Sequence, residues 1–282
     1  MLLNFIIIAL IGIGLYFGYQ AIVENIMKPS KNYPNIAAVL PNKKILVCAG
    51  DSLTHGNMSY DWVRDLSAEL PDYQVFNAGI NADLSYTLLN RLDDIIAVKP
   101  LHINILIGGN DIVAQSRPLK KSDRYITFKK IPWGTQPNLQ SYEDNLRQII
   151  ARLKLETTAS ISLMSIAPIG EDLQHPIYKT VQKYNESVKK VADTAGVAYL
   201  PLHETLHAYL ENHHAASHIP YEKTSAHTTK AAYLNIFLRW DWDEITRFYN
   251  HLLTFDNLHF NSIGGKMIGG LLVTHLKRSA QS

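Results

Sequence analysis

Short apolar runs alternate with helical patterns along most of this chain. The runs are nearly continuous, as in strands that are covered on both faces of a sheet. They occupy residues 45–48, 74–77, 102–107, 161–166 and 197–200. Apolar residues at helical spacing lie between or beside them, over residues 60–70, 85–98, 141–155 and 177–195. This alternation predicts a parallel sheet with helices on both faces, and such sheets bind ligands at the carboxyl ends of their strands.

Polar motifs stand where the first three strands end. The first strand runs into Gly-Asp-Ser-Leu, which exposes the hydroxyl of Ser52. The second ends in Asn-Ala-Gly, with the glycine at Gly79, and the third is followed by Gly-Gly-Asn-Asp, which contains Asn110. Near the C-terminus, Asp256 and His259 stand three residues apart, before a predicted helix.

These residue types are the parts of a serine nucleophile site. Such a serine needs a base, a group that orients the base, and hydrogen-bond donors for the oxyanion that develops on attack. We expect Ser52 to be the nucleophile, His259 the base and Asp256 its partner. The backbone N–H groups of Ser52 and Gly79 and the side-chain amide of Asn110 are the expected oxyanion donors.

The four motifs, in this order, resemble the blocks of the SGNH hydrolases, also called the GDSL esterase/lipase family. The resemblance covers about residues 44–278. It implies that Ser52, Gly79, Asn110 and His259 are the residues that name the family and that Asp256 is its triad acid. It also implies a three-layer α/β/α sandwich with a five-stranded parallel sheet, similar to flavodoxin, and hydrolysis of an acyl ester through an acyl-enzyme without a cofactor. Lipids, lysophospholipids and acylated carbohydrates all remain open as substrates.

The chain begins with an apolar segment. Residues 2–23 contain no charged side chain, and about twenty such residues span a bilayer as a helix. A cleaved signal peptide would carry basic residues ahead of the apolar segment, but no lysine or arginine precedes Lys28. We therefore expect residues 1–27 to be an uncleaved membrane anchor. Residues 28–43, which contain three prolines, are the expected tether to a hydrolase domain over residues 44–282.

Two arguments about the side of the membrane on which the catalytic domain lies disagree. Lysines at positions 28, 31, 43 and 44 follow the apolar segment, and the positive-inside rule would keep the domain that follows them in the cytoplasm. The resemblance implies the opposite side, because similar proteins with such an N-terminus usually work outside the cytoplasm. We expect the catalytic domain to lie outside.

Two segments interrupt the alternation of strands and helices. Residues 115–138 combine six basic residues with Tyr125, Phe128 and Trp133 against a single acid, Asp123. A solvated loop is one interpretation, and a flap that contacts an anionic substrate or a membrane surface is another. Residues 202–253 are rich in histidine and aromatic residues. We interpret them as a mostly helical cap over the site.

The cap contains a competing motif. His203, Glu204 and His207 form His-Glu-x-x-His, with His213 at the spacing of a third metal ligand. On a helix the two histidines of that motif share one face and bind zinc, with the glutamate as general base. The chain has Leu210 where the longer zinc-protease motif requires a glycine. A zinc-dependent hydrolase is thus the alternative to a serine esterase.

Composition narrows the choice of partner. The formal net charge of +2 is too small to indicate binding to nucleic acid. The one cysteine, Cys48, lies inside the first strand and excludes an internal disulfide. A non-catalytic binding protein on the same scaffold is a further alternative, but every part of the hydrolytic site is present in the sequence.

Overall fold

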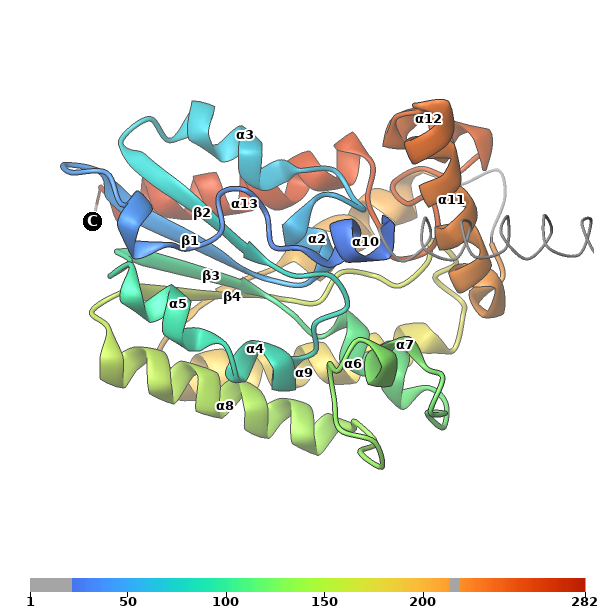
Figure 1. Ribbon diagram of the computed structural model, residues 1–282, viewed down its shortest axis with the longest axis horizontal. Coiled ribbons are helices and arrows are strands. Elements are labelled where there is room, and N and C mark those ends of the chain that lie inside the picture. The colour runs from blue at the N-terminus through green and yellow to red at the C-terminus, as the bar shows by residue number, and fades with distance from the viewer. Residues whose placement is uncertain (1–21, 214–218, 282) are drawn as a thin grey trace, which may run out of the picture.

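The computed structural model describes residues 22–213 and 219–281. Its centre is a five-stranded parallel sheet in the order β2-β1-β3-β4-β5 (Figure 1). The strands are β1 (Lys44–Gly50), β2 (Tyr73–Gly79), β3 (His102–Leu106), β4 (Ser160–Met164) and β5 (Ala198–Leu200). The predicted parallel sheet is confirmed, since each predicted strand is present within three residues of its predicted bounds.

Helices cover both faces of the sheet (Figure 1). One layer contains α4 (Ser85–Leu89), α5 (Leu92–Ala97), α8 (Leu139–Glu156) and α9 (Ile177–Ala195), packed on the apolar side chains of one sheet face. The other contains α3 (Trp62–Glu69), α10 (Leu202–Asn212) and α13 (Ser262–Ser279). The predicted α/β/α sandwich is therefore confirmed.

The helix predicted over residues 85–98 is two helices, because the chain breaks at Arg91. The guanidinium of Arg91 turns inward, where Nη2 donates to the carbonyl oxygens of Gly50 at 3.0 Å and Ala78 at 2.8 Å. Its Nε donates to the buried carboxylate of Asp83 at 2.6 Å. The arginine thus ties together the carboxyl ends of β1 and β2, close to the predicted site.

Of residues 202–253, which were predicted to form a cap, the first helix belongs to the core of the domain and only the remainder stands apart from it. Its first helix, α10, buries Leu202, Leu206 and Leu210 in the core layer with α13. These leucines recur every four residues, so they form one apolar stripe that packs against the sheet layer. The remainder, η2 (Tyr221–Lys223), α11 (Thr224–Leu238) and α12 (Trp242–Phe248), forms a separate lobe, whose core is closed by Phe255 (Figure 1).

The segment predicted as a flap follows α6 (Gly109–Gln115) and contains α7 (Arg124–Thr127). It is fastened to the body of the protein by Tyr125 and Ile131, which are buried against Leu84 and Ala114. The lone acid Asp123 caps α7 through the N–H of Tyr125. The segment is therefore a packed part of the domain.

The predicted anchor overlaps the described residues only at residues 22–27. Most of the anchor predicted over residues 1–27 lies outside the described residues, and residues 22–27 are helical. None of the helices within residues 22–213 and 219–281 is long and apolar enough to cross a membrane. The predicted tether is docked, because Asn32 accepts a hydrogen bond from the N–H of Asn77 at 2.9 Å, along the open edge of β2.

Candidate active site

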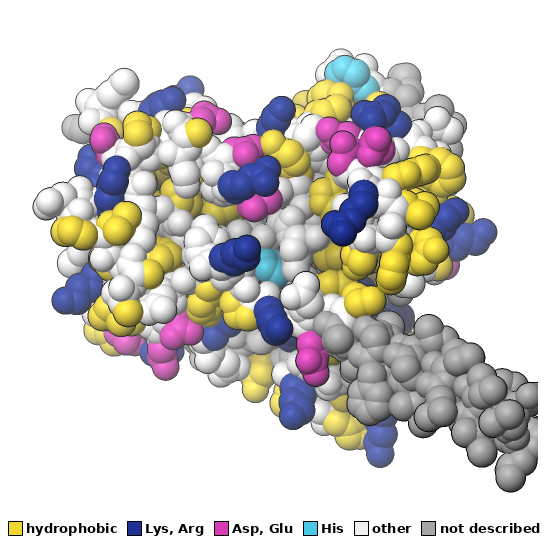
Figure 2. Space-filling model, turned by 45° about the horizontal axis from the view of Figure 1, so that its top comes forward, with side chains coloured by type: hydrophobic (Ala, Val, Ile, Leu, Met, Phe, Trp, Pro, Cys, Tyr) yellow, Lys and Arg dark blue, Asp and Glu magenta, His cyan; other side chains and the backbone are white. Residues whose placement is uncertain are grey.

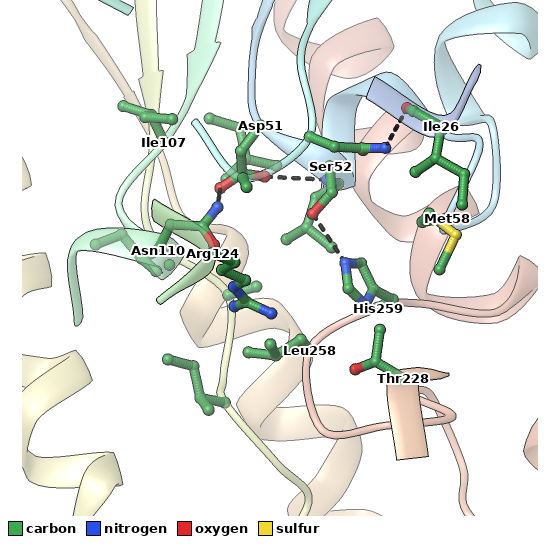
Figure 3. Close-up of a pocket in the computed structure, with 18 of the residues that line it drawn as sticks. Ile26, Asp51, Ser52, Met58, Ile107, Asn110, Arg124, Thr228, Leu258 and His259 are labelled. Carbon is green, nitrogen blue, oxygen red and sulfur yellow. Dashed lines mark hydrogen bonds between the residues drawn. The ribbon is translucent and has the colours of Figure 1, made fainter. Parts of the chain in front are cut away.

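Ser52, His259 and Asp256 form a hydrogen-bonded series at the carboxyl end of β1. Ser52 is the first residue of α2 (Ser52–His55), which follows β1 after one residue. Its Oγ lies 2.9 Å from Nε2 of His259. Nδ1 of the same imidazole lies 2.8 Å from Oδ2 of Asp256. The structure thus brings Ser52, from the N-terminal part of the chain, to His259 and Asp256 near the C-terminus. Figure 3 shows the bond between Ser52 and His259.

The carboxylate of Asp256 is buried and fully hydrogen-bonded. One oxygen accepts from the backbone N–H groups of Leu258 and His259, at 3.0 and 2.8 Å. The other accepts from the hydroxyl of Thr228, on α11, at 2.5 Å. Burial alone would raise the pKa of Asp256, but the imidazole and these donors outweigh burial and hold the pKa below its ordinary value. The carboxylate therefore stays ionised beside the imidazole.

A pocket opens beside Ser52 and His259 (Figure 3). Its walls come from the ends of several strands, from the N-terminal segment and from α7. Most of the lining is apolar, and these residues include Ile26, Met27, Leu53, Met58, Phe128, Ile166 and Ile169. The polar side chains in the lining include Asn110, Arg124 and Thr228. Such a pocket suits an acyl ester, with an apolar part to bury and a polar reacting centre.

The N-terminal wall of the pocket is held in place by two asparagines. The carbonyl oxygen of Ile26 accepts hydrogen bonds from the side-chain amides of Asn57 and Asn81, each at 2.8 Å. Oδ1 of Asn57 in turn accepts from the amide of Asn81, also at 2.8 Å. The end of helix 22–27 is thereby fixed at the edge of the pocket.

The prediction that Gly79 supplies an oxyanion donor is wrong. Its N–H donates to Oδ1 of Asn77 at 2.9 Å, and the residue does not line the pocket. A Cβ at this position would lie 2.2 Å from the backbone nitrogen of His55 and 2.6 Å from the carbonyl carbon of Thr54. The glycine is needed because α2 packs directly on the end of β2.

Ala82, three residues further on, is in the position that was predicted for Gly79. It lines the pocket and has a φ of 60°, a conformation that is uncommon for residues other than glycine. Its N–H donates no hydrogen bond to any group in the described part of the chain, and the same holds for the N–H of Ser52. Both groups are free to bind an oxyanion.

Asn110 lies in the pocket as predicted, and its amide is held from both ends. Oδ1 accepts from the hydroxyl of the buried Tyr125 at 2.9 Å. Nδ2 donates to the carbonyl oxygen of Asp83 at 3.0 Å and to Oδ2 of Asp51 at 3.3 Å. Burial raises the pKa of Asp51 to about 6. The longer bond to Asp51 is the weaker of the two, so this amide hydrogen is the one available to a substrate.

The His-Glu-x-x-His motif is not assembled as a zinc site. The two carboxylate oxygens of Glu204 accept hydrogen bonds from Ser165 at 3.0 Å and from Tyr199 at 2.7 Å. His207 is engaged by Tyr178 at 2.6 Å, and His213 is stacked on Tyr209. Within residues 22–213 and 219–281, histidine, cysteine and acidic side chains form no group suited to hold a metal ion. In the described structure Glu204 and His207 of the motif are thus engaged by neighbours on α9, on β5 and directly after β4.

Ala82, Arg124 and Thr228 were missed as site residues from the sequence. Thr228 is one of several threonines and serines on α11, and nothing in the sequence distinguishes it. Arg124 belongs to the basic segment that was proposed as a flap, but its basic neighbours carry the same signal. For Ala82 the one available signal was its position, shortly after the second strand.

Comparisons with known proteins agree with this fold. The profile of the GDSL-like lipase/acylhydrolase family matches residues 48–266. The comparison with curated proteins gave no match. Among solved structures, the chain is similar to the acetylxylan esterase Axe2 from Geobacillus stearothermophilus, with 19% identity and a TM-score of 0.58 over 84% of this chain and 96% of that one.

Two further solved structures are similar. The acetyl xylan esterase AlAXEase has 19% identity and a TM-score of 0.57, over 82% of this chain and 99% of that one. LAE5, an alpha/beta hydrolase enzyme from the metagenome of Lake Arreo, Spain, has 17% identity and a TM-score of 0.58, over 85% and 97%. At these identities the structures show the shared fold, whereas the profile covers most of the chain. The chain belongs to the GDSL-like lipase/acylhydrolase family and is a hydrolase of ester bonds.

Proposed function

We propose that the protein is a serine esterase that acts through an acyl-enzyme. The observation that carries the proposal is the series from Ser52 Oγ to His259 Nε2, at 2.9 Å, and from Nδ1 to Asp256, at 2.8 Å. In the first step Oγ attacks the acyl carbon while its proton passes to Nε2. The bond from carbon to the leaving oxygen then breaks, and the imidazolium gives its proton to that oxygen. Water repeats the attack with the same base and restores the Ser52 hydroxyl.

The oxyanion in both steps would be bound by the N–H groups of Ser52 and Ala82 and by Nδ2 of Asn110. The amide reaches the oxyanion by exchanging its long 3.3 Å bond to Asp51 for a shorter bond to the oxyanion. Removal of one such donor typically lowers the rate by about 10² to 10³.

The substrate is proposed to be an acyl ester at a membrane surface, either a lipid or an acylated carbohydrate. Two of the similar solved structures are acetylxylan esterases, which supports a carbohydrate ester. The largely apolar pocket supports burial of an acyl chain. The pocket edge at Ile26 lies only three residues after the apolar segment of residues 2–23. An active site in that position would meet substrates at or near the bilayer.

Membrane attachment through residues 1–27, with the catalytic domain outside the cytoplasm, is part of the same proposal. Exposed apolar side chains gather on the lobe of α11 and α12 (Figure 2), where Tyr233, Phe237, Leu238 and Phe248 are each at least half exposed. An exposed apolar patch of this kind on the surface of a domain suits contact with lipid. Protease added to intact cells should digest the domain; a domain that is digested only after lysis would place it in the cytoplasm.

Fluorophosphonate labelling of the full-length chain in detergent tests the proposed chemistry. Labelling should be lost in Ser52→Ala and in His259→Ala. It should persist in Ser116→Ala, which alters an exposed serine outside the pocket, and it should be unaffected by a chelator. A folded wild-type protein that is not labelled, or a Ser52→Ala variant labelled like the wild type, would remove the serine mechanism. Activity that is lost on chelation would restore the zinc alternative.

A further inference from the structure

Arg124 brings a positive charge into the pocket from outside the α/β/α repeat. It is the first residue of α7, and Figure 3 shows its guanidinium between Asn110 and His259. Nη2 donates to the hydroxyl of Tyr125 at 2.9 Å, and the ring of Tyr125 lies 4.9 Å from the guanidinium carbon. Within the described residues, Nε is buried and has no hydrogen-bond partner, and the one hydrogen bond that this side chain donates goes to Tyr125.

No carboxylate in the described part of the chain forms an ion pair with Arg124. The adjacent Asp123 pairs with Arg117 and caps α7, so its carboxylate is occupied. The buried Asp256 is bound to His259 and Thr228. By contrast, the buried Lys130 of the same segment is paired with Asp83 at 2.6 Å. A guanidinium with an unpaired buried N–H is costly unless an acceptor arrives.

The position of Arg124 also places it close to the reacting centre. Arg124 donates to the hydroxyl of Tyr125, and that hydroxyl donates to Oδ1 of Asn110. The guanidinium is thus two hydrogen bonds away from the proposed oxyanion donor. A group bound to Arg124 would lie beside the scissile ester, within the same small molecule.

We infer that Arg124 binds an anionic group, a carboxylate or a phosphate, carried by the ester substrate close to the scissile bond. The planar guanidinium offers paired N–H donors that match the oxygens of both anions. The apolar residues Ile26, Met27 and Met58 line the pocket as well, so the preferred substrate is an anionic amphiphile. This inference rests on the proposed esterase function and names the substrate class of that site.

Two isosteric esters test the inference in the full-length protein. The acetate ester of 4-hydroxybenzoate carries a carboxylate, and the acetate ester of 4-hydroxybenzamide is neutral and of the same shape. The wild type should prefer the anionic ester, measured as kcat/KM. Arg124→Gln should lower kcat/KM for the anionic ester by about 10- to 100-fold, the usual effect of losing a hydrogen bond to a charged group, and change it by less than about threefold for the neutral ester. The acetate ester of 4-hydroxyphenyl phosphate, run in parallel, distinguishes a phosphate site from a carboxylate site.

Lys120→Gln is the matched control, because it removes one positive charge from an exposed position in the same segment. It should leave the ratio of the two rates unchanged. An equal loss on both esters in Arg124→Gln, or a wild type without preference for either anion, would overturn the inference while leaving the esterase function intact. A wild type that hydrolyses none of these esters and is not labelled at Ser52 would overturn both.

Discussion

Asp111 should make the protein less stable as the pH rises. This carboxyl lies at the start of α6, directly after Asn110, and is buried. Its oxygens accept hydrogen bonds from the hydroxyl of Ser85 at 2.6 Å and from the N–H of Ser85 at 2.9 Å. No lysine or arginine of the described residues forms an ion pair with it. Burial raises the pKa of Asp111 to about 7, against an ordinary value of 3.8.

The sign and size of the effect follow from this pKa. The folded state binds the proton more tightly than the unfolded chain, so the stabilisation is fully present below pH ~4 and is lost as the pH rises through ~7. A shift of about three units corresponds to about 4 kcal/mol at 1.36 kcal/mol per unit. Asp111→Asn stays neutral at every pH. Its free energy of unfolding should therefore increase relative to the wild type by about 4 kcal/mol between pH 4 and pH 8.

Urea unfolding of both proteins in one detergent, from pH 4 to pH 8, measures this difference. All groups that Asp111 does not influence titrate alike in the two proteins, so they cancel in the comparison. Asp72→Asn makes the same chemical change at an exposed position and should give a difference that hardly varies with pH. If the wild-type and Asp111→Asn curves run parallel across the range, the buried carboxyl is not protonated in the folded state, and the reasoning fails.

Two further predictions concern the glycine under α2 and the threonine on α11. Gly79→Ala should lower the free energy of unfolding by about 3 kcal/mol or more, because its Cβ would overlap backbone atoms of His55. The control, Gly270→Ala on α13, meets nothing within 4 Å and should not destabilise the protein. A fully stable Gly79→Ala would contradict the packing described. Thr228→Val removes a hydrogen bond to the ionised Asp256 and should raise the pKa of that carboxyl and lower kcat about tenfold on an aryl acetate. Thr229→Val, at the exposed neighbouring position, serves as its control, and equal rates in both variants would show that the hydroxyl does not support Asp256.

The sequence was sufficient for the sheet and for the residues around Ser52. The apolar runs are short and bounded by glycine or proline, which distinguishes buried strands from helices. Because parallel strands present their carboxyl ends at one edge, the motifs that follow them had to meet there. The proximity of Ser52 to His259 also depends on α13, which packs against α3 and α10 in one helix layer.

The sequence was not sufficient where contacts decide the structure. Gly79 ends β2 and Ala82 comes shortly after it, and only the packing of α2 shows which one faces the pocket. The break at Arg91 depends on carbonyl oxygens of β1 and β2, which no local pattern reveals. Arg124 and Lys130 are alike as sequence, but one is paired with a carboxylate and the other points into the pocket. Such distinctions are tertiary, so periodicity and motif spacing carry no information about them.

The hydrogen bonds from Asn57 and Asn81 to Ile26 make residues 26 and 27 part of the folded catalytic unit. An N-terminal apolar segment is commonly removed when a domain is produced for study. A fragment designed in that way would start at about residue 30. Here that cut would remove Ile26 and Met27 and leave the two asparagine amides facing an empty groove. The catalytic unit and the proposed N-terminal anchor, residues 1–27, therefore overlap in sequence. Substrate selectivity measured on a shortened fragment would describe a different, wider pocket.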